Sequence, residues 1–270
     1  MTVLHNKLYV VTERNCDIEV YDSVTFNHET KLQVDGMSNP MDIASCSRNT
    51  CLYICDCKSE NDINILRVDS SQTPSKCWPI RENAGHLSVT RVGNVVVSLF
   101  NGNKINEYSP DGILIREVRL SPADNINHPW HAIKTTSMHF IFSHGIGNDP
   151  LQRVCVASAD GKIMKSFGGK KGKDIKEEHM NRPVHLLEDR SRNVLVADMK
   201  NGRVFLLSPT LEYKRTLLSS DSKLRFPMRL CLDEERGILF VADNNYKEKE
   251  CTYDNGRILV FNCKTQKSQI

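Results

Sequence analysis

The stretch Val194-Leu195-Val196-Ala197-Asp198 decides the fold, because runs of the same kind recur along the whole chain. The other runs end at Thr12, Asp56, Leu99, His144 and Asp243. The steps between successive run ends are 44, 43, 45, 54 and 45 residues. A period near this length, with several short strands in each unit, is typical of a β-propeller blade. The sequence therefore predicts an all-β fold, a six-bladed β-propeller.

The unit around Asp198 shows the internal order of one blade. Strands are predicted over 183–187, 194–198, 203–207 and 213–218. Pro183 suits the first residue of a strand, where no amide hydrogen is needed, and Gly202 suits the tight turn after the second strand. Each blade is thus expected to be a four-stranded antiparallel sheet, stacked on its neighbours around a channel.

The whole chain, 1–270, is predicted to form a single propeller domain. The approximate blades are 1–35, 36–82, 83–122, 123–168, 181–222 and 223–270, with an inserted basic loop at 169–180. The first strand of blade one is limited to residues 2–4, and 264–270 are all that remain for a fourth strand of blade six. Either the first strand is short or the chain is a fragment of a longer protein, and we expect the fragment.

Charge and hydropathy exclude some classes of function. The chain has 36 basic and 33 acidic residues, a net charge of +3, so its overall field does not require a polyanionic partner. It contains neither an apolar run long enough to cross a membrane nor a secretory leader. We expect a cytoplasmic protein with no membrane or DNA partner.

Ten cysteines are many for such a domain, and four of them crowd into 46–57. Their spacing matches no structural zinc pattern. A Cys46–Cys51 disulfide is conceivable across a turn in an oxidising compartment. Buried free thiols acting as small apolar side chains are the favoured interpretation.

The repeats resemble the NHL-repeat family of six-bladed propellers. The match is clearest from Phe167-Gly168-Gly169 through Pro183 to the run 196–204 (VADMKNGRV), and again from 241–243 (VAD) to 255–258 (NGRI). It is strongest to the NHL domains at the C-terminus of RING/B-box (tripartite-motif) proteins and their invertebrate relatives. The resemblance implies a structural role for the motif residues Asp198, Asn201, Arg203, Asp243, Asn255 and Arg257, which are expected to fix the turn after the second strand.

Loops on one face of the propeller are the predicted binding surface. The candidates are basic residues near the inserted loop and the neighbouring turns: Lys170, Lys171, Lys173, Lys176, Arg182, Lys200, Arg225, Lys247 and Lys249. Several NHL propellers carry protein partners or RNA on this face, so the resemblance implies either ligand. RNA affinity would fall with salt as counterions are released, but acidic residues dilute the loop.

Three histidines occupy one position in three consecutive first strands: His86, His131 and His185. Three imidazoles are a catalytic zinc set, and NHL-like amidating lyases hold a metal in such a propeller. Asp42 and Arg229 fill the same position in other blades, so the trio is not singled out. Histidines hydrogen-bonded between blades are the favoured interpretation.

The sequence shows no nucleophile elbow, metalloprotease motif or phosphate-binding glycine loop. We therefore expect a non-catalytic recognition module without a cofactor, a monomeric propeller within a parent protein that can itself be oligomeric. Its expected ligand is a protein, and in a RING-type ubiquitin ligase it would select the substrate. The alternatives are an RNA-binding propeller using the lysine-rich loop and a metal-dependent hydrolase or lyase using the three histidines.

Overall fold

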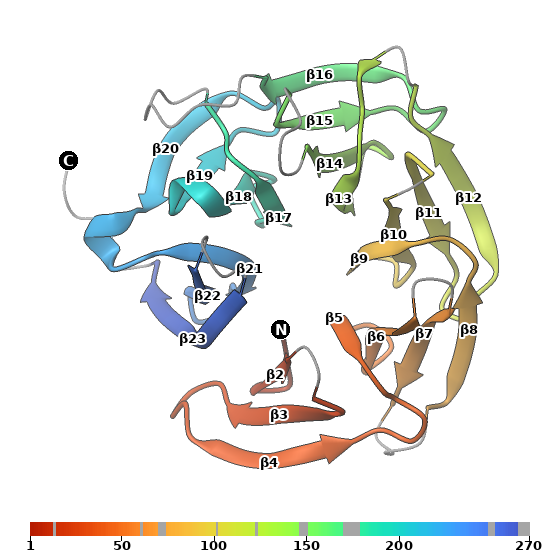
Figure 1. Cartoon of the computed structure of the whole chain (residues 1–270), viewed down its shortest axis with the longest axis vertical. Helices are drawn as coiled ribbons and strands as arrows, with labels where there is room; N and C mark the ends of the chain where they lie inside the picture. The colour runs from red at the N-terminus through yellow and green to blue at the C-terminus, as the bar shows by residue number, and fades with distance from the viewer. Residues whose placement is uncertain are drawn as a thin grey trace.

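The structure is a computed structural model that describes residues 1–12, 15–59, 62–69, 74–100, 102–121, 124–145, 151–169, 179–247 and 252–263. For 245–247 and 252–255 it describes the backbone alone. Six antiparallel sheets surround a central axis, as Figure 1 shows, and this confirms the predicted six-bladed β-propeller. Five sheets have four strands, and the described residues of the sixth form three. Residues 264–270, the expected source of a fourth strand, lie outside the described part.

The strands follow one another in sequence order from the axis outward. Blade one contains β1 (Thr2–Leu4), β2 (Lys7–Val11), β3 (Asp17–Asp22) and β4 (His28–Gln33). Blade two contains β5 (Pro40–Cys46), β6 (Cys51–Ser59), β7 (Asp62–Val68) and β8 (Lys76–Ile80). Blade three contains β9 (Ala84–Val89), β10 (Val95–Leu99), β11 (Lys104–Tyr108) and β12 (Leu114–Arg119). Blade four contains β13 (Pro129–Lys134), β14 (Phe140–His144), β15 (Arg153–Ala157) and β16 (Ile163–Gly168).

Blade five matches its prediction closely. It contains β17 (Pro183–Glu188), β18 (Val194–Asp198), β19 (Arg203–Leu207) and β20 (Tyr213–Leu218), with the 3-10 helix η2 (Met199–Asn201) after β18. Gly202 ends η2 in the left-handed conformation with φ 60°, as the tight turn requires. Blade six contains β21 (Phe226–Asp233), β22 (Ile238–Lys247) and β23 (Thr252–Asn262), preceded by η3 (Ser220–Ser222).

The apolar core lies between blades rather than at one centre. Alternate residues of a strand point to opposite neighbours, so Leu239 and Val241 pack toward blade five while Phe240 and Ala242 face blade one. Five of the interfaces between neighbouring blades contain nine to fourteen buried apolar residues among those described. The interface between blades six and one, called the seam below, contains four: Met1, Leu8, Cys231 and Phe240. The ring is therefore packed least densely at the seam.

The motif aspartates tie each second strand to the loop that enters the same blade. Asp198 Oδ1 accepts the Asn181 amide hydrogen at 2.8 Å, and Asp198 Oδ2 accepts hydrogen bonds from Asn201 Nδ2 and Arg203 Nε at 2.8 Å each. In blade six Asp243 likewise accepts the amide hydrogens of the two residues before Pro227. The expectation that these residues fix the turn after the second strand is therefore only partly right. The backbone that the carboxylate holds is the segment entering the innermost strand.

The described cysteines are free thiols. Cys46 and Cys51 are opposite each other in the β5–β6 pair and are both buried, but no disulfide joins them. Burial raises the pKa of the Cys51 thiol, which keeps it protonated at neutral pH. In the described part of the chain, no helix is long and apolar enough to cross a membrane.

Candidate functional site

Polar side chains meet in one layer at the propeller axis. They come from the shared position of five innermost strands: Asp42, His86, His131, His185 and Arg229. The four acidic and imidazole side chains are buried, with 9% or less of each residue exposed. The sequence alignment of the repeats had placed these residues in one layer, and the structure brings them into contact.

Three of these side chains accept a backbone hydrogen bond from the next blade. Leu87 N donates to Asp42 Oδ2 at 3.1 Å, Leu186 N to His131 Nδ1 at 3.3 Å, and Leu230 N to His185 Nδ1 at 3.4 Å. Because an amide can only donate here, Nδ1 of both histidines is unprotonated and the ring proton of each neutral imidazole sits on Nε2. The predicted hydrogen bonding of histidines between blades is therefore present at His131 and His185.

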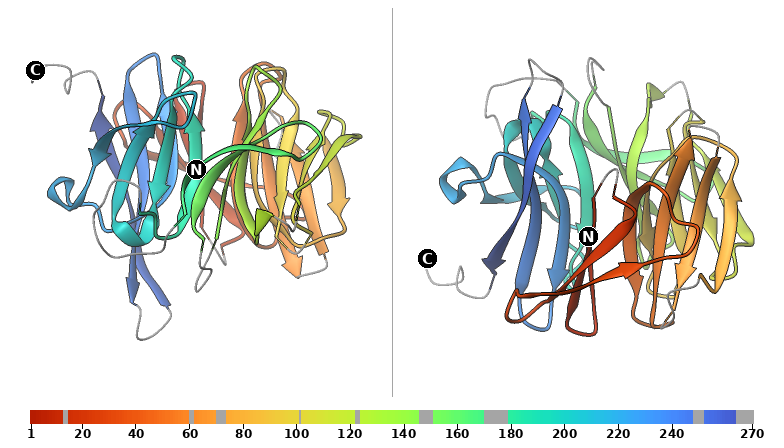
Figure 2. Two further views of the ribbon diagram at one scale, coloured as in Figure 1. Left: turned by 90° about the horizontal axis from the view of Figure 1, so that it is seen from above. Right: turned by 60° about the horizontal axis from the view of Figure 1, so that its bottom comes forward.

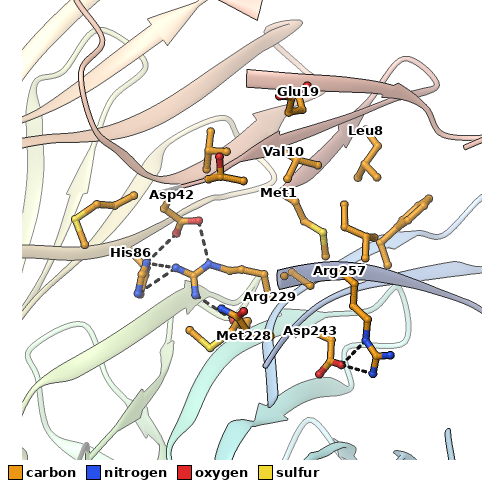
Figure 3. A pocket seen from close by; sticks show the side chains of 18 of the residues that line it. Met1, Leu8, Val10, Glu19, Asp42, His86, Met228, Arg229, Asp243 and Arg257 are labelled. Carbon is orange, nitrogen blue, oxygen red and sulfur yellow. Dashed lines mark hydrogen bonds and ion pairs between the residues drawn. The ribbon is translucent and has the colours of Figure 1, made fainter. Parts of the chain in front are cut away.

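His86 behaves differently, because it joins an ionic cluster. Asp42 Oδ1 accepts a hydrogen bond from Arg229 Nε at 3.2 Å, and Asp42 Oδ2 lies 3.3 Å from His86 Nδ1. Arg229 NH2 also contacts the His86 ring, at 3.1 Å from Nε2. Figure 3 shows the three side chains pointing toward one another from β5, β9 and β21.

Burial and charge fix the protonation of this cluster. Burial, aided by the Arg229 charge, lowers the pKa of His86 to about 4, so the imidazole is neutral at neutral pH. Burial alone would raise the pKa of Asp42, but Arg229 and His86 outweigh it and hold the Asp42 pKa well below its usual range. The cluster is thus an aspartate–arginine ion pair in contact with a neutral imidazole.

The histidine trio does not form a metal site. The rings of His131 and His185 are in contact, with centroids 4.1 Å apart and planes tilted by 32°, and burial lowers the pKa of His131 to about 3. Their Nδ1 atoms face amide donors and their Nε2 atoms carry protons, so neither ring offers a metal a free lone pair. No group of three potential metal ligands is found in the described residues. The donor set therefore does not fit the hypothesis of a zinc-like centre at His86, His131 and His185.

A cavity of about 1000 Å³ extends from this cluster into the seam. Its inner end is lined by Asp42, His86 and Arg229, and its walls are mainly apolar side chains of blades one and six. Those walls include Val10, Tyr21, Phe26, Phe240, Ala242, Ile258 and Val260. Phe26 and Val260 are 45% and 40% exposed, so the cavity is open to solvent. Its size, and its apolar walls interrupted by charged groups such as Asp42, Arg182 and Arg229, suit a small-molecule site.

Aromatic residues and an arginine stand at the channel end of the cavity. Phe100 and Trp130 have ring centroids 4.9 Å apart, and the Arg182 guanidinium lies 5.4 Å from the centre of the Trp130 ring. Gly85 makes room for Phe100, because an added Cβ at Gly85 would stand 2.6 Å from the Phe100 ring. All three side chains line the cavity, on the face where the second strands end.

The structure brings one of the predicted binding residues, Arg182, into this cavity. Arg225 is exposed, and Lys200 is half-buried within η2. Lys170, Lys171, Lys173, Lys176 and Lys249 lie outside the described residues, and Lys247 is described only in its backbone. The predicted lysine surface therefore stays a prediction.

Sequence reasoning missed Asp42 and Arg229 as a charge pair, and it missed Trp130, Phe100 and the seam. A usable signal existed for the pair, because both residues stand at the position that drew attention to the histidines. An acid and a base in one layer of a closed ring are within reach of each other. No comparable pattern marks the seam, since its walls come from opposite ends of the chain.

Known protein structures share this architecture. A protein of unknown function from Bacteroides caccae matches with a TM-score of 0.72 at 12% identity, over 96% of this chain and 90% of that one. Hydrazine synthase from Kuenenia stuttgartiensis matches with a TM-score of 0.62 at 10% identity, over 96% and 93%. A streptogramin B lyase matches with a TM-score of 0.55 at 16% identity, over 83% and 68%. At such identities the likeness shows the fold alone, a β-propeller.

No protein-family model matches the chain, and no curated protein matches it in sequence. The resemblance to NHL repeats and tripartite-motif proteins is therefore not confirmed beyond the propeller fold. The expectation that the chain is not an enzyme is wrong, because its structural neighbours include two enzymes, the lyase and the synthase. Missing linear motifs gave no basis for that expectation, since a propeller can assemble an axial site from one residue per blade.

Proposed function

We propose that this propeller binds a small organic substrate in the seam cavity and acts on its polar end by proton transfer. The observation that supports the proposal is the buried Asp42–His86–Arg229 cluster at the inner end of a cavity whose walls are mainly apolar. Convergent, perturbed titratable groups in a concave site are the usual mark of a reaction centre. The reaction class that suits these groups is hydrolysis or elimination.

Each member of the cluster has a chemical task in this proposal. Neutral His86 can accept a proton, and Asp42 lies close enough to stabilise the imidazolium that results. Arg229 carries a fixed positive charge for an oxygen that becomes negative during the reaction. Phe100 and Trp130 line the channel side of the cavity and would contribute apolar surface for the body of the substrate.

A ligand screen with a cavity-filling control tests the proposal. Compounds that raise the melting temperature of the wild-type chain are expected to lose this effect in Ala242→Phe, whose added ring would occupy the seam. Bound compounds are then incubated with wild type and with His86→Gln, and products are followed by mass spectrometry. Turnover by wild type that His86→Gln lacks is the expected result. Stabilisation that persists in Ala242→Phe, or equal turnover in His86→Gln, would refute the proposal.

A second candidate is recognition of a protein partner by an NHL-type propeller. It is favoured by the ribbon that β22 and β23 form beyond Asp243, where residues 245–247 pair with 252–254. Figure 2 shows this ribbon projecting from the ring, on the face where the second strands end. Pull-down with full-length chain and with a chain whose ribbon tip is shortened would test it; equal recovery of partners by both would remove the ribbon as the contact.

RNA binding by the lysine-rich loop stays a prediction. Ultraviolet crosslinking in cells tests it, with a variant carrying Lys170→Glu, Lys171→Glu and Lys173→Glu beside the wild type. Crosslinking that is lost in the variant would support an RNA ligand, and crosslinking at background level in both would exclude it. Counterion release predicts that any such binding weakens with salt.

A further inference from the structure

The charges around the seam cavity do not cancel once their partners are assigned. Asp42 is paired with Arg229, and Asp243 accepts hydrogen bonds from Arg257 at 2.8 and 3.0 Å. Figure 3 shows both pairs at the cavity wall. Glu19, the third acidic residue of the lining, is bound by His28 and Lys31 at 2.8 Å each. Among the described lining residues, Arg182 is the cation left without an acidic partner.

Two buried hydrogen-bond donors, one on Arg182 itself and one on the neighbouring Trp130, are unsatisfied. Arg182 Nε and Trp130 Nε1 are both buried, and neither has a hydrogen-bond partner among the described residues. They belong to one stacked pair, because the guanidinium lies over the tryptophan ring. Buried donors normally have a partner, so two neighbouring exceptions at a cavity indicate an acceptor supplied from outside the chain. A carboxylate fits best, since it brings acceptor oxygens and a negative charge together.

Away from this head site, part of the cavity wall is apolar and suits an apolar part of a ligand. Away from the axis its walls are Val10, Phe240, Ala242 and Ile258, which face each other across the seam. The strands that carry these residues, β2, β22 and β23, extend from the face where the second strands end toward Phe26. The Phe26 ring packs edge-on against the Phe240 ring, with ring centroids 6.0 Å apart. An occupant of this part gains by burying apolar surface and has few polar atoms to bond.

We propose that the cavity takes an amphipathic organic anion, a single-chain carboxylate whose head is bound by Arg182 and Trp130 Nε1 and whose apolar body lies in the seam. The proposal rests on the seam cavity being the ligand site proposed above, and it adds the class of ligand. The head would lie on the channel side of the cavity, close to the Asp42–His86–Arg229 cluster.

Three probes with one chain length separate charge from apolar burial: decanoate, decanol and decyltrimethylammonium, each below its micelle concentration. Trp130 reports binding, because the chain has two tryptophans and Trp78→Phe leaves Trp130 alone. Trp78 lies between blades two and three, away from the cavity lining. Fluorescence titration is expected to show decanoate binding at least tenfold more tightly than decanol, with the ammonium weakest.

Variants assign the preference to the head site. Arg182→Gln is expected to abolish the preference for decanoate over decanol while decanol affinity stays within about twofold. Arg225→Gln is the control matched in charge, because it removes one arginine charge from an exposed residue of the segment that enters the next blade, two residues before Pro227. Ala242→Phe should weaken all three probes. Circular dichroism and melting curves verify that each variant is folded.

The outcomes separate this proposal from the proposed function. Equal affinities for decanoate and decanol, a preference that survives Arg182→Gln, or one lost equally in Arg225→Gln would overturn the anion proposal. Failure of every probe to bind would overturn it as well. In each case the ligand screen with Ala242→Phe still decides independently whether the cavity is a substrate site.

Discussion

The ion pair between Glu107 and Lys134 allows a quantitative test of how neighbouring blades are held together. Glu107 lies on β11 of blade three and Lys134 on β13 of blade four. Lys134 Nζ is 2.7 Å from both carboxylate oxygens, and the two side chains are 0% and 8% exposed. Asn94 Nδ2 also donates to Glu107 Oε1 at 2.7 Å. Because the pair is buried, removal of one partner leaves a charge that water cannot solvate.

Lys134→Met should therefore be strongly destabilising. Loss of one member of a buried pair costs about 3–5 kcal/mol. For a domain near this size, that loss lowers the melting temperature by roughly 6–20 °C. Adding Glu107→Leu should restore most of the stability, since a well-packed apolar pair is close to neutral relative to the ion pair. A residual cost of about 1–2 kcal/mol is expected from the amide of Asn94, which loses its acceptor.

Urea unfolding followed by circular dichroism measures both single variants and the double variant, provided that the slopes with denaturant agree. Lys104→Met is the control, because Lys104 pairs with Glu82 at 2.8 Å where the side chains are 20% and 36% exposed. A surface pair of this kind contributes about 0–1 kcal/mol. If the double variant loses as much as the sum of the two single variants, the reasoning about an uncompensated buried charge is wrong.

Three further predictions follow from the buried polar layer and the turns. The free energy of unfolding should fall as the pH is lowered from 6.5 toward 4. The pKa values of His86 and His131 are lowered in the folded chain, so in this range only the unfolded chain takes up protons at these residues. The expected loss is about 1.4 kcal/mol per pH unit for each histidine. Urea unfolding at pH 7.5 and 5.5 checks this, and a His131→Gln variant that falls as steeply as wild type would contradict it. Gly161→Ala should lower the melting temperature far more than Gly36→Ala. Both glycines have φ near +80°, but an added Cβ at Gly161 would stand 1.9 Å from the Arg119 carbonyl oxygen, whereas one at Gly36 would meet open space. Asp198→Ala should cost about 3–5 kcal/mol in urea, because Arg203 is left buried without its carboxylate; a loss below about 1 kcal/mol would show that the motif contact is dispensable.

The strands and their order were predictable from the sequence for a local reason. Each inner strand packs against two neighbouring blades, so runs such as 194–197 are apolar throughout and recur with the blade period. In blade five, Pro183 marks the start of the first strand and Gly202 marks the turn after the second strand. The strands β17 to β20 begin at the residues that the sequence predicts. This information lies within about 45 residues of chain.

The site depends on contacts that no local pattern reports. Asp42 and Arg229 are 187 residues apart and meet because the ring closes. The width of the seam cavity depends on how closely blade six approaches blade one. A small side chain such as Ala242 leaves space there only in combination with the residue it faces in blade one, Val10. The expectation of a non-enzyme rested on missing linear motifs, and such motifs do not describe a site assembled around an axis.

The hydrogen bonds between blades at the axis have a consequence for how such a ring can evolve. Each acceptor side chain, Asp42, His131 or His185, bonds a backbone amide of the following blade. This bond is separate from the side-chain contacts that Asp42 makes with His86 and His131 makes with His185. A blade therefore places no demand on the residue type of its successor at that contact. Duplicated or exchanged units remain compatible as long as each supplies one acceptor, and the axial residues are free to diversify into new chemistry while the ring stays joined.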